Sequence, residues 1–323
     1  MRKGFVIAIV VFALFIVWIQ PFDLGKQEVT ISKGATAHEI MSVLASKHII
    51  RSRNEILLWL RLLNQEKTLK FGTYELARYK NPLYYIRELS FSAEKEIVVT
   101  IPEGLTIDET AAILESRALI DRDIFTKLCA DRKFIKEKGY DAATLEGYLF
   151  PDTYFFSESQ NETTICRIML RNFTNHMREL KLNASDSLRE ILIIASLVEK
   201  EARFDDERPL IAGVFVNRLK IRRPLESCAT VIYALKASGN PRFANYTALL
   251  EKDLKFESPY NTYLHPGMPP GPICSPGVSS IQAARQPAST DYLYFVLMDN
   301  GRHYFSRSYK EHLAAKDKYR AQD

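Results

Sequence analysis

The sequence is poor in the residue patterns that build metal sites. Its four cysteines, Cys129, Cys166, Cys228 and Cys274, are far apart and form no CxxC pair, so a structural zinc site is not expected. Their mostly apolar neighbours predict buried thiols; disulfides are compatible with an exported chain, but the spacing assigns no pairing. The six histidines include no HExxH pattern and do not cluster at ligand spacing. The sequence therefore predicts no metal site.

Motifs of nucleophilic and phosphate chemistry are also missing. The chain has no GxSxG motif and no P-loop, and the prolines of "GPICSPG" (residues 271–277) indicate a turn rather than a nucleophile elbow. Lys and Arg number 44 against 39 Asp and Glu, a net charge of +5, and no dense basic run is interleaved with aromatic residues. This mild excess suits an anionic surface or polymer, but it does not indicate a nucleic-acid-binding protein.

The chain is nevertheless rich enough in apolar residues to fold. It has 323 residues, of which 46% are hydrophobic and 26% charged, so we expect a globular protein with more than one domain. An uncharged apolar stretch, residues 4–22, follows Arg2 and Lys3. As an α-helix it would span about 28 Å, close to the hydrocarbon thickness of a bilayer.

The flanks of this apolar stretch predict its orientation. The positive charges before it favour a cytoplasmic N-terminus with the rest of the chain outside, and Trp18 lies near the far end, where an interfacial aromatic residue is favoured. A cleaved signal peptide is the alternative, but no convincing small-x-small site follows Trp18. We therefore expect an uncleaved single-pass anchor.

A sequence echo follows the anchor. Residues 29–44 ("VTISKGATAHEIMSVL") and 99–114 ("VTIPEGLTIDETAAIL") share Val, Thr, Ile, Gly, Thr and Glu at the same offsets. Both predict a short strand, a glycine turn and a helix that begins with a capping box. The capping pairs are Thr36 with Glu39 and Thr106 with Glu109. The echo indicates two related βα modules, although capped helices after strands commonly share such residues.

Further elements follow from local patterns. Residues 53–64, 81–91, 162–180 and 308–321 predict helices, and "DYLYFVLMDNGRHYFS" (residues 291–306) predicts a β-hairpin around an Asn-Gly turn. A long loop rich in proline and glycine, residues 258–279, includes "SPYNTY". A structureless loop of this length is more often functional than accidental.

One helix carries an acidic group on an apolar face. In the predicted helix at residues 185–203, a nearly unbroken apolar run meets Glu199, Lys200 and Glu201. At about 100° per residue, Glu199 lies within about 20° of Leu188 on the apolar side, whereas Lys200 and Glu201 point to the flanks. A desolvated carboxyl group favours its protonated form, as a general acid requires. The alternative is a structural ion pair of Glu199 with Lys200 or an arginine.

A second segment combines aromatic and acidic residues. "EGYLFPDTY" contains Glu146, Tyr148, Asp152 and Tyr154 around a Pro-Asp turn. Aromatic rings stack on sugar faces and carboxylates accept hydrogen bonds from hydroxyl groups, so this mixture suits a carbohydrate. The alternative is a core strand that ends in a Pro-Asp turn. "SPYNTY" has the same polar and aromatic character.

Six motifs together carry a family resemblance. They are "LEGYLFPDTY", "ASLVEKEA", "ERPLIAGVFVNRL", "SPYNTY", "GMPPGPICSPG" and "DYLYFV", in this order. With them the chain resembles the endolytic murein transglycosylases, the MltG or YceG-like family, over nearly its full length. The resemblance implies an α+β chain with an N-terminal transmembrane helix (residues 1–22 with its cytoplasmic tip), a small LysM-like α+β module (27–96) and a larger mixed α/β catalytic domain (97–323).

The resemblance also implies a function and a location. It implies an enzyme of the bacterial cytoplasmic membrane whose catalytic domain lies outside the cytoplasm and cuts nascent peptidoglycan glycan strands. Its partners would be these strands, the membrane and the cell-wall synthases, and Glu199 would be catalytic. The residues expected to hold the glycan are Glu146, Tyr148, Asp152, Tyr154, Asn217, Glu226, Thr230, Tyr260, Asn261, Thr262 and Tyr263. One departure is "LESCATV" (residues 225–231), where many members read "LQSDPTV"; Glu226 could alter the pH dependence of Glu199 if the two are close.

A single carboxylate predicts an unusual mechanism. Glycosidases usually use two carboxylates. Here Glu199 would protonate the oxygen leaving C1 of N-acetylmuramic acid and then take the proton of the C6 hydroxyl, so that a 1,6-anhydro end forms without water or a cofactor. The alternatives are a muramidase-type hydrolase that uses the same acid with water, and a non-catalytic cell-wall-binding scaffold.

Overall fold

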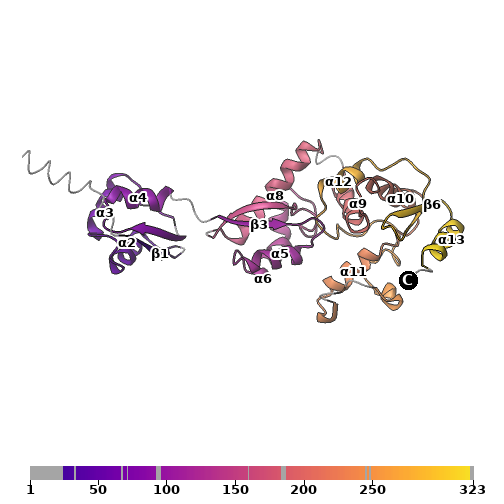
Figure 1. Cartoon of the computed structure of the whole chain (residues 1–323), viewed down its shortest axis with the longest axis horizontal. Helices are drawn as coiled ribbons and strands as arrows, with labels where there is room; N and C mark the ends of the chain where they lie inside the picture. The colour runs from indigo at the N-terminus through magenta and orange to yellow at the C-terminus, as the bar shows by residue number, and fades with distance from the viewer. Residues whose placement is uncertain are drawn as a thin grey trace, which may run out of the picture. The chain divides into compact units, whose positions relative to one another are not determined.

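The computed structural model describes residues 25–320 except residues 33, 67, 71, 92–95, 159, 183–186, 244, 245, 247 and 248. In this part of the chain, helices and two-stranded sheets form two compact units (Figure 1). Unit 1 comprises the residues up to Ile97 together with Phe155–Gln160, and unit 2 comprises Val98–Tyr154 together with the residues from Asn161 onward. The chain is therefore a mixed α+β protein, as the sequence predicts.

The predicted membrane anchor, residues 4–22, lies outside the described residues. Among the helices that are described, none combines the length and the hydrophobicity that crossing a bilayer requires.

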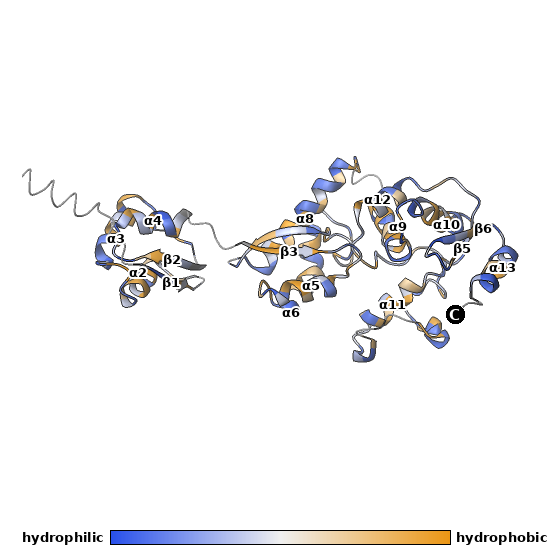
Figure 2. Cartoon of the chain, viewed as in Figure 1, coloured by the Kyte–Doolittle hydropathy of each residue, from blue (hydrophilic) through white to orange (hydrophobic). Residues whose placement is uncertain are grey.

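Unit 1 has its own hydrophobic core. Strand β1 (Lys26–Ile31) pairs antiparallel with β2 (Gly72–Ala77), so that Val29 lies opposite Tyr74. The helices of this unit are α2 (Ala37–Ser46), α3 (Arg53–Leu62) and α4 (Pro82–Phe91). Their apolar side chains form one buried cluster with those of the sheet. Figure 2 colours the hydrophobic residues of these elements orange. The predicted helices at 53–64 and 81–91 are confirmed, each with slightly different ends.

Both halves of the sequence echo form the predicted unit. Strand β1 is followed by α2, and β3 (Glu96–Ile101) is followed by α5 (Ile107–Ser116). At the start of α2, the Thr36 hydroxyl accepts the Glu39 N–H at 3.3 Å and the Glu39 carboxylate accepts the Thr36 N–H at 2.7 Å. Thr106 and Glu109 repeat the pattern at 3.2 and 3.0 Å at the start of α5. The two predicted capping boxes are therefore confirmed.

Unit 2 contains part of a small sheet, a hairpin and most of the helices. Strands β3 and β4 (Asp152–Ser157) form a two-stranded sheet, in which the hydroxyls of Thr100 and Thr153 are 2.9 Å apart. The remaining helices are α6 (Arg122–Cys129), α7 (Arg132–Glu137), α8 (Glu162–Glu179), α9 (Leu188–Glu201), α10 (Arg208–Lys220), α11 (Cys228–Ala237), α12 (Val278–Arg285) and α13 (Tyr309–Arg320). Two short 3₁₀ helices, at Pro241–Phe243 and Glu251–Lys255, precede the loop rich in proline and glycine.

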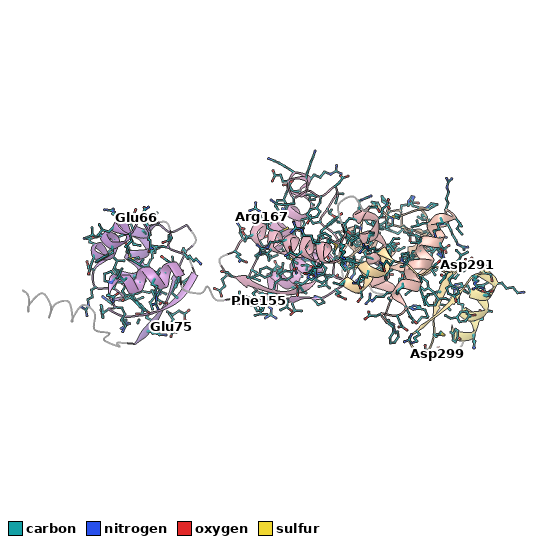
Figure 3. The ribbon with its side chains drawn as sticks, turned by 90° about the horizontal axis from the view of Figure 1, so that it is seen from above. Glu66, Glu75, Phe155, Arg167, Asp291 and Asp299 are labelled. Atoms are coloured by element: carbon teal, nitrogen blue, oxygen red, sulfur yellow. The ribbon has the colours of Figure 1, made fainter. Side chains whose placement is uncertain are left out.

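The hairpin at the end of unit 2 is confirmed. Strand β5 (Tyr294–Leu297) pairs antiparallel with β6 (His303–Ser306), so that Leu297 lies opposite His303. Gly301 takes a left-handed conformation (φ +77°) in the turn, and Asp299 in the same turn is exposed (Figure 3). An Asn-Gly pair favours this geometry because glycine carries no Cβ.

Helix α9 is deeply buried in unit 2. All seven residues from Leu192 to Val198 are buried, because α10, α11 and α12 pack around this helix. The apolar run therefore does not mark one face of a surface helix. It is typical of a helix that is enclosed on most sides, and its C-terminal end carries Glu199.

The cysteines correct one expectation. All four are free thiols; Cys129, Cys166 and Cys274 are buried as predicted, but Cys228 is exposed. Cys228 is the first residue of helix α11. Polar residues, Glu226 and Ser227, directly precede it in the sequence, and its nearest apolar neighbour in sequence follows it. Its thiol lies 3.1 Å from the Tyr263 hydroxyl.

Candidate active site

Glu199 lies in the last turn of α9 and is almost covered. Its side chain is 8% exposed, so the predicted burial is confirmed. The Arg208 Nη1 donates to Glu199 Oε1 at 3.3 Å, and the Gly277 N–H donates to Glu199 Oε2 at 3.0 Å. A carboxylate held between a guanidinium group and a backbone N–H is stabilised in its ionised form. The ion pair considered in the sequence interpretation is therefore present, and its cation is Arg208 rather than Lys200.

Arg208 is itself held in place by two further groups. It is the first residue of α10 and is 9% exposed. Its Nε donates to Asp205 Oδ1 at 2.9 Å, and its Nη1 also donates to the Ser280 hydroxyl of α12. Because Glu199, Asp205 and Ser280 belong to α9, the α9–α10 loop and α12, the guanidinium group has a defined position beside Glu199.

The loop rich in proline and glycine brings Gly277 to the glutamate. Its Ile273 N–H donates to the Ser196 hydroxyl of α9 at 3.1 Å. The Gly104 N–H donates to the Ser275 carbonyl at 2.8 Å, and the Ser275 N–H donates to the Leu105 carbonyl at 2.8 Å. The loop is thus tied both to α9 and to the β3–α5 turn, so its backbone can serve as a rigid wall of the site.

A second acidic side chain lies at the same glycine. A Cβ added to Gly277 would be 1.9 Å from Glu103 Oε1 and 2.0 Å from Glu103 Cδ, so the Glu103 carboxyl group occupies the space over this glycine. A Cβ added to Gly104 would be 3.6 Å from Glu199 Cγ. Burial and the charge of Glu199 raise the pKa of Glu103, and the charge of Arg208 opposes them. Glu103 and Glu199 are therefore neighbours in space, although 96 positions separate them in sequence.

Gly147, the residue after Glu146, packs against Pro272 of the loop rich in proline and glycine. This glycine has φ +84°, and an added Cβ would lie 2.6 Å from Pro272 Cβ and 2.7 Å from Pro272 Cγ. Only glycine therefore fits at this position, both by backbone conformation and by space.

We expect Gly147→Ala to destabilise unit 2 by about 3 kcal/mol or more, because backbone strain and overpacking add. Gly139→Ala is the matched control: Gly139 has φ +85°, but nothing lies within 4 Å of an added Cβ. Strain alone should cost about 1 kcal/mol there. Urea denaturation followed by circular dichroism measures both changes, and equal losses for the two variants would contradict the contact with Pro272.

Three of the predicted glycan-binding residues in the segment 144–156 are buried. Glu146 accepts the Ile107 N–H at 3.1 Å and the Tyr233 hydroxyl at 3.3 Å, and burial raises its pKa to about 8. The Tyr148 ring packs against the rings of Tyr140 and Phe173. The remaining two differ in exposure: the Tyr154 hydroxyl donates to the Phe150 carbonyl at 2.6 Å in the interior, and Asp152 is exposed and accepts from Asn172 Nδ2 at 2.8 Å.

Several other predicted binding residues support the loop from inside. Asn261 is fully buried and donates to the carbonyls of Leu254 and Phe256 at 2.9 and 2.8 Å. The hydroxyls of Thr230 and Thr262 are 2.9 Å apart and both are buried. The Asn217 amide donates to the carbonyls of Thr290 and Tyr292 at 2.6 and 3.1 Å. These polar groups are engaged within the protein, and their role in glycan binding stays a prediction.

The last three predicted binding residues are partly accessible. Glu226 forms an ion pair with Arg218 at 2.9 Å, and its backbone has φ +51°. The Tyr260 ring lies 4.9 Å from the Tyr233 ring, and Tyr263 contacts Cys228. These side chains retain surface that a ligand could contact.

Glu201, the other acidic residue of this helix end, is also desolvated. It accepts the Ser227 hydroxyl at 2.9 Å, and burial raises the pKa of its carboxyl group against this hydrogen bond. The sequence places Glu201 at a flank of the apolar face. Its side chain is partly exposed there, and Ser227 of the segment 225–231 contacts it.

Unit 2 contains a cavity large enough for a ligand. It has a volume of about 910 Å³, and its lining includes Glu109, Arg122, Glu146, Tyr233 and Lys236. Glu109 and Lys236 form an ion pair at 3.0 Å at this cavity. Small-molecule and sugar sites commonly fall in this size range.

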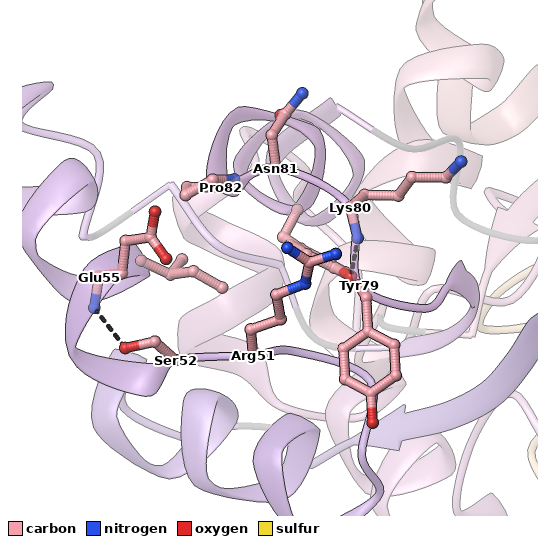
Figure 4. A pocket seen from close by; sticks show the side chains of 9 residues that line it. Arg51, Ser52, Glu55, Tyr79, Lys80, Asn81 and Pro82 are labelled. Carbon is pink, nitrogen blue, oxygen red and sulfur yellow. Dashed lines mark hydrogen bonds between the residues drawn. The ribbon is translucent and has the colours of Figure 1, made fainter. Parts of the chain in front are cut away.

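A pocket in unit 1 is much smaller. It has a volume of about 50 Å³ and lies between the start of α3 and the segment before α4 (Figure 4). The Glu55 N–H donates to the Ser52 hydroxyl at 3.3 Å, and the Lys80 N–H donates to the Tyr85 hydroxyl at 2.9 Å. A space of this size holds one or two water molecules but not a sugar ring.

The geometry shows what sequence reasoning missed. Residue type and spacing do not distinguish Arg208, Gly277 and Glu103, although each lies inside one of the motifs or the repeat described above. For Glu103 a signal existed: the two copies of the echo differ at this position, where Lys33 in the first copy corresponds to Glu103 in the second. Among the described residues, no three His, Cys, Asp or Glu side chains are grouped as ligands for a metal ion.

Comparisons with known proteins agree on one family. The model of the YceG-like family matches residues 29–318. The Bacillus subtilis (strain 168) protein named endolytic murein transglycosylase is 33% identical over 312 residues, which cover 90% of this chain and 84% of the relative. A Streptococcus pneumoniae serotype 2 protein of the same name is 29% identical, and its match covers 90% of this chain and 58% of the relative.

A solved structure is similar along most of its length. The crystal structure of a yceG-like protein from Listeria monocytogenes superposes with a TM-score of 0.57 at 30% sequence identity, covering 90% of this chain and 98% of that one. The family match extends over most of the chain and includes the elements that bring Glu199, Arg208 and Gly277 together. The chain therefore belongs to the YceG-like family.

Proposed function

We propose that this protein is an endolytic murein transglycosylase. It cleaves the bonds between N-acetylmuramic acid and N-acetylglucosamine within peptidoglycan glycan strands, leaves 1,6-anhydro ends and so terminates strand elongation. The observation that carries the proposal is the nearly covered carboxyl group of Glu199 (8% exposed), held by Arg208 and the Gly277 N–H. The names of the Bacillus and Streptococcus relatives support the choice of substrate.

The reaction needs one group that can give a proton and take one back. Glu199 donates its proton to the glycosidic oxygen, the bond from C1 to this oxygen breaks, and positive charge develops on C1 and the ring oxygen. The Glu199 carboxylate then takes the proton of the C6 hydroxyl, and O6 bonds to C1. Glu199 is protonated again, and no water is consumed.

The partners of Glu199 fit the second half of this reaction. Once the proton has left, Arg208 and the Gly277 N–H stabilise the carboxylate and keep its oxygens oriented. Because both donors belong to packed elements, the carboxylate does not need to rearrange between the two proton transfers. The reaction requires no cofactor.

We further propose where the enzyme works. The apolar residues 4–22 anchor the chain in the cytoplasmic membrane of a bacterium, with a cytoplasmic N-terminus and the catalytic unit outside. Unit 1 is the LysM-like module and contacts the glycan; its separate hydrophobic core supports an independent binding role. An enzyme so anchored meets strands as they leave the cell-wall synthases, which are the proposed protein partners.

Analysis of the products tests the reaction. Purified protein incubated with uncrosslinked glycan strands should release fragments whose new ends are lighter than reducing ends by the mass of one water molecule. A digest in heavy-oxygen water sharpens the result, because a transglycosylase incorporates no label at the new C1. Mass spectrometry measures both.

Each alternative gives a different result in this experiment. Reducing ends that carry the heavy oxygen would identify a muramidase-type hydrolase. Glycan that co-sediments with the protein but stays uncut would identify a binding scaffold. Either result would overturn the proposed reaction.

A further inference from the structure

Two acidic side chains share one glycine at the candidate active site. The Gly277 N–H donates to Glu199, and the Glu103 carboxyl group lies over the α-carbon of the same residue. The β3–α5 turn that carries Glu103 is fixed to the proline- and glycine-rich loop by the two hydrogen bonds between Ser275 and the Gly104–Leu105 backbone. The proximity of the two carboxyl groups is therefore built into the fold and does not depend on a flexible side chain alone.

The direct contacts of Glu199 suit a carboxylate, whereas the first step of the proposed reaction needs a carboxylic acid. Its direct partners, Arg208 and the Gly277 N–H, both favour the ionised form. Burial favours the neutral form, but burial beside a guanidinium group is partly compensated. A general acid must hold its proton until the substrate is bound, so another group has to act against Arg208.

Glu103 has the charge and the position to oppose the effect of Arg208. It makes no hydrogen bond or ion pair with any residue that the structure describes, in contrast to Glu199. The residue is exposed, but its carboxyl group lies against Gly277, and this partial burial together with the charge of Glu199 raises its pKa. An unpaired carboxyl group next to a paired one is the arrangement in which two acids titrate together.

The other charges around the pair lead to the same conclusion. Asp205 faces Arg208 from the α9–α10 loop at 2.9 Å, and the Lys200 Nζ lies 3.8 Å from the position of a Cβ on Gly104. Lys200 also acts on Glu109, which pairs with Lys236 at 3.0 Å. With every group ionised, four carboxylates (Glu103, Glu109, Glu199 and Asp205) and three cations (Arg208, Lys200 and Lys236) leave a net charge of −1. Binding of one proton by the group removes this imbalance.

We propose that Glu103 is a positioning residue that acts through Glu199: the two carboxyl groups bind one proton between them, and the repulsion between two carboxylates keeps this proton in the pair until Glu199 gives it to the leaving oxygen. This inference rests on the proposed role of Glu199. A glycan strand that covers Glu103 would exclude water and lower the local dielectric, so that the coupling becomes stronger in the complex than in the free enzyme. The site then has two carboxyl groups, as the sites of most glycosidases do, although only Glu199 transfers the proton.

The pH profile of Glu103→Gln tests the proposal. Glu103→Gln removes one of the two coupled carboxyl groups, so the alkaline limb of the kcat and kcat/KM profiles should move to lower pH by about one unit. The cleavage rate near pH 7.5 should then fall roughly tenfold, and near pH 5 it should approach the wild-type rate. KM should not change. Glu103→Asp, which keeps the charge, should restore most of the alkaline limb.

Two controls separate the possible outcomes. Glu115→Gln makes the same charge change on the exposed side of α5 and should leave the profile in place. A Glu103→Gln profile that coincides with wild type, or an equal loss at every pH with weakened glycan binding, would overturn the inference. If Glu199→Gln still cleaves, the proposed function fails; if it is inactive while Glu103→Gln is unchanged, only this inference fails.

Discussion

Replacing Glu199 with glutamine is expected to lower the rate of glycan cleavage by at least about a thousandfold and to leave glycan binding nearly unchanged. The glutamine has the same shape, and its carbonyl oxygen can still accept a hydrogen bond from Arg208 or Gly277. Its amide cannot give or take a proton, however, so both proton transfers of the proposed reaction are lost. Cleavage is measured by chromatography of the released fragments, and binding by co-sedimentation with purified murein.

Glu201→Gln is the matched control for this variant. It makes the same substitution two residues later on α9, at a carboxyl group whose contact is the Ser227 hydroxyl rather than Arg208. We expect cleavage within about tenfold of wild type, because a neutral amide can still accept that hydrogen bond. Cleavage by Glu199→Gln would show that the acid is another group. Equal loss in both variants would indicate damage to the helix end instead.

The second large effect concerns stability and comes from Glu146. Its carboxyl group is buried, and desolvation raises its pKa from 4.5 to about 8. The folded protein therefore keeps a proton that the unfolded chain releases. This group contributes its full stability below about pH 4.5, and the contribution declines as pH rises and is lost once pH passes about 8.

The size of this decline follows from the shift. About 3.5 units at 1.36 kcal/mol each correspond to a loss of about 5 kcal/mol in the free energy of unfolding between acid and mildly alkaline pH. Glu146→Gln has no ionisation to suppress, and the Tyr233 hydroxyl can turn to accept from the new amide. We expect the variant to lack this decline and to be more stable than wild type near pH 8.

Urea denaturation at several pH values measures the difference between the two proteins. Other groups also titrate, so the informative quantity is the gap between wild type and Glu146→Gln, which should widen steadily with pH. Glu115→Gln, at an exposed position, should run parallel to wild type. Parallel curves for Glu146→Gln would mean that the buried carboxyl group ionises without cost in the folded protein.

The helical wheel of α9 was right about Glu199 for an incomplete reason. It assigned one buried face, but seven consecutive residues of this helix are buried, and Glu201 is desolvated as well. A wheel compares directions around one axis and has no information about how many neighbours surround that axis. What distinguishes Glu199 from Glu201 is its partner: one meets Arg208 and Gly277, the other meets Ser227.

Sequence by itself determined the parts of this protein that depend on near neighbours in the chain. The capping boxes at Thr36 and Thr106 and the hairpin at Asn300-Gly301 involve groups at most a few residues apart, so residue type and spacing are sufficient to predict them. The motifs also indicate the family of the chain, and the match of the YceG-like family model to residues 29–318 confirms it.

Only the tertiary structure decided which groups surround the glutamate. Glu103, Glu199, Arg208 and Gly277 come from a turn, a helix end, a helix start and a loop, and no local period relates their positions in the chain. Their meeting depends on how α10 and α12 pack against α9 and on the hydrogen bonds between Ser275 and the β3–α5 turn. Electrostatic coupling falls off with distance in space and not along the sequence, so the charge environment of the carboxyl group is a property of the packing.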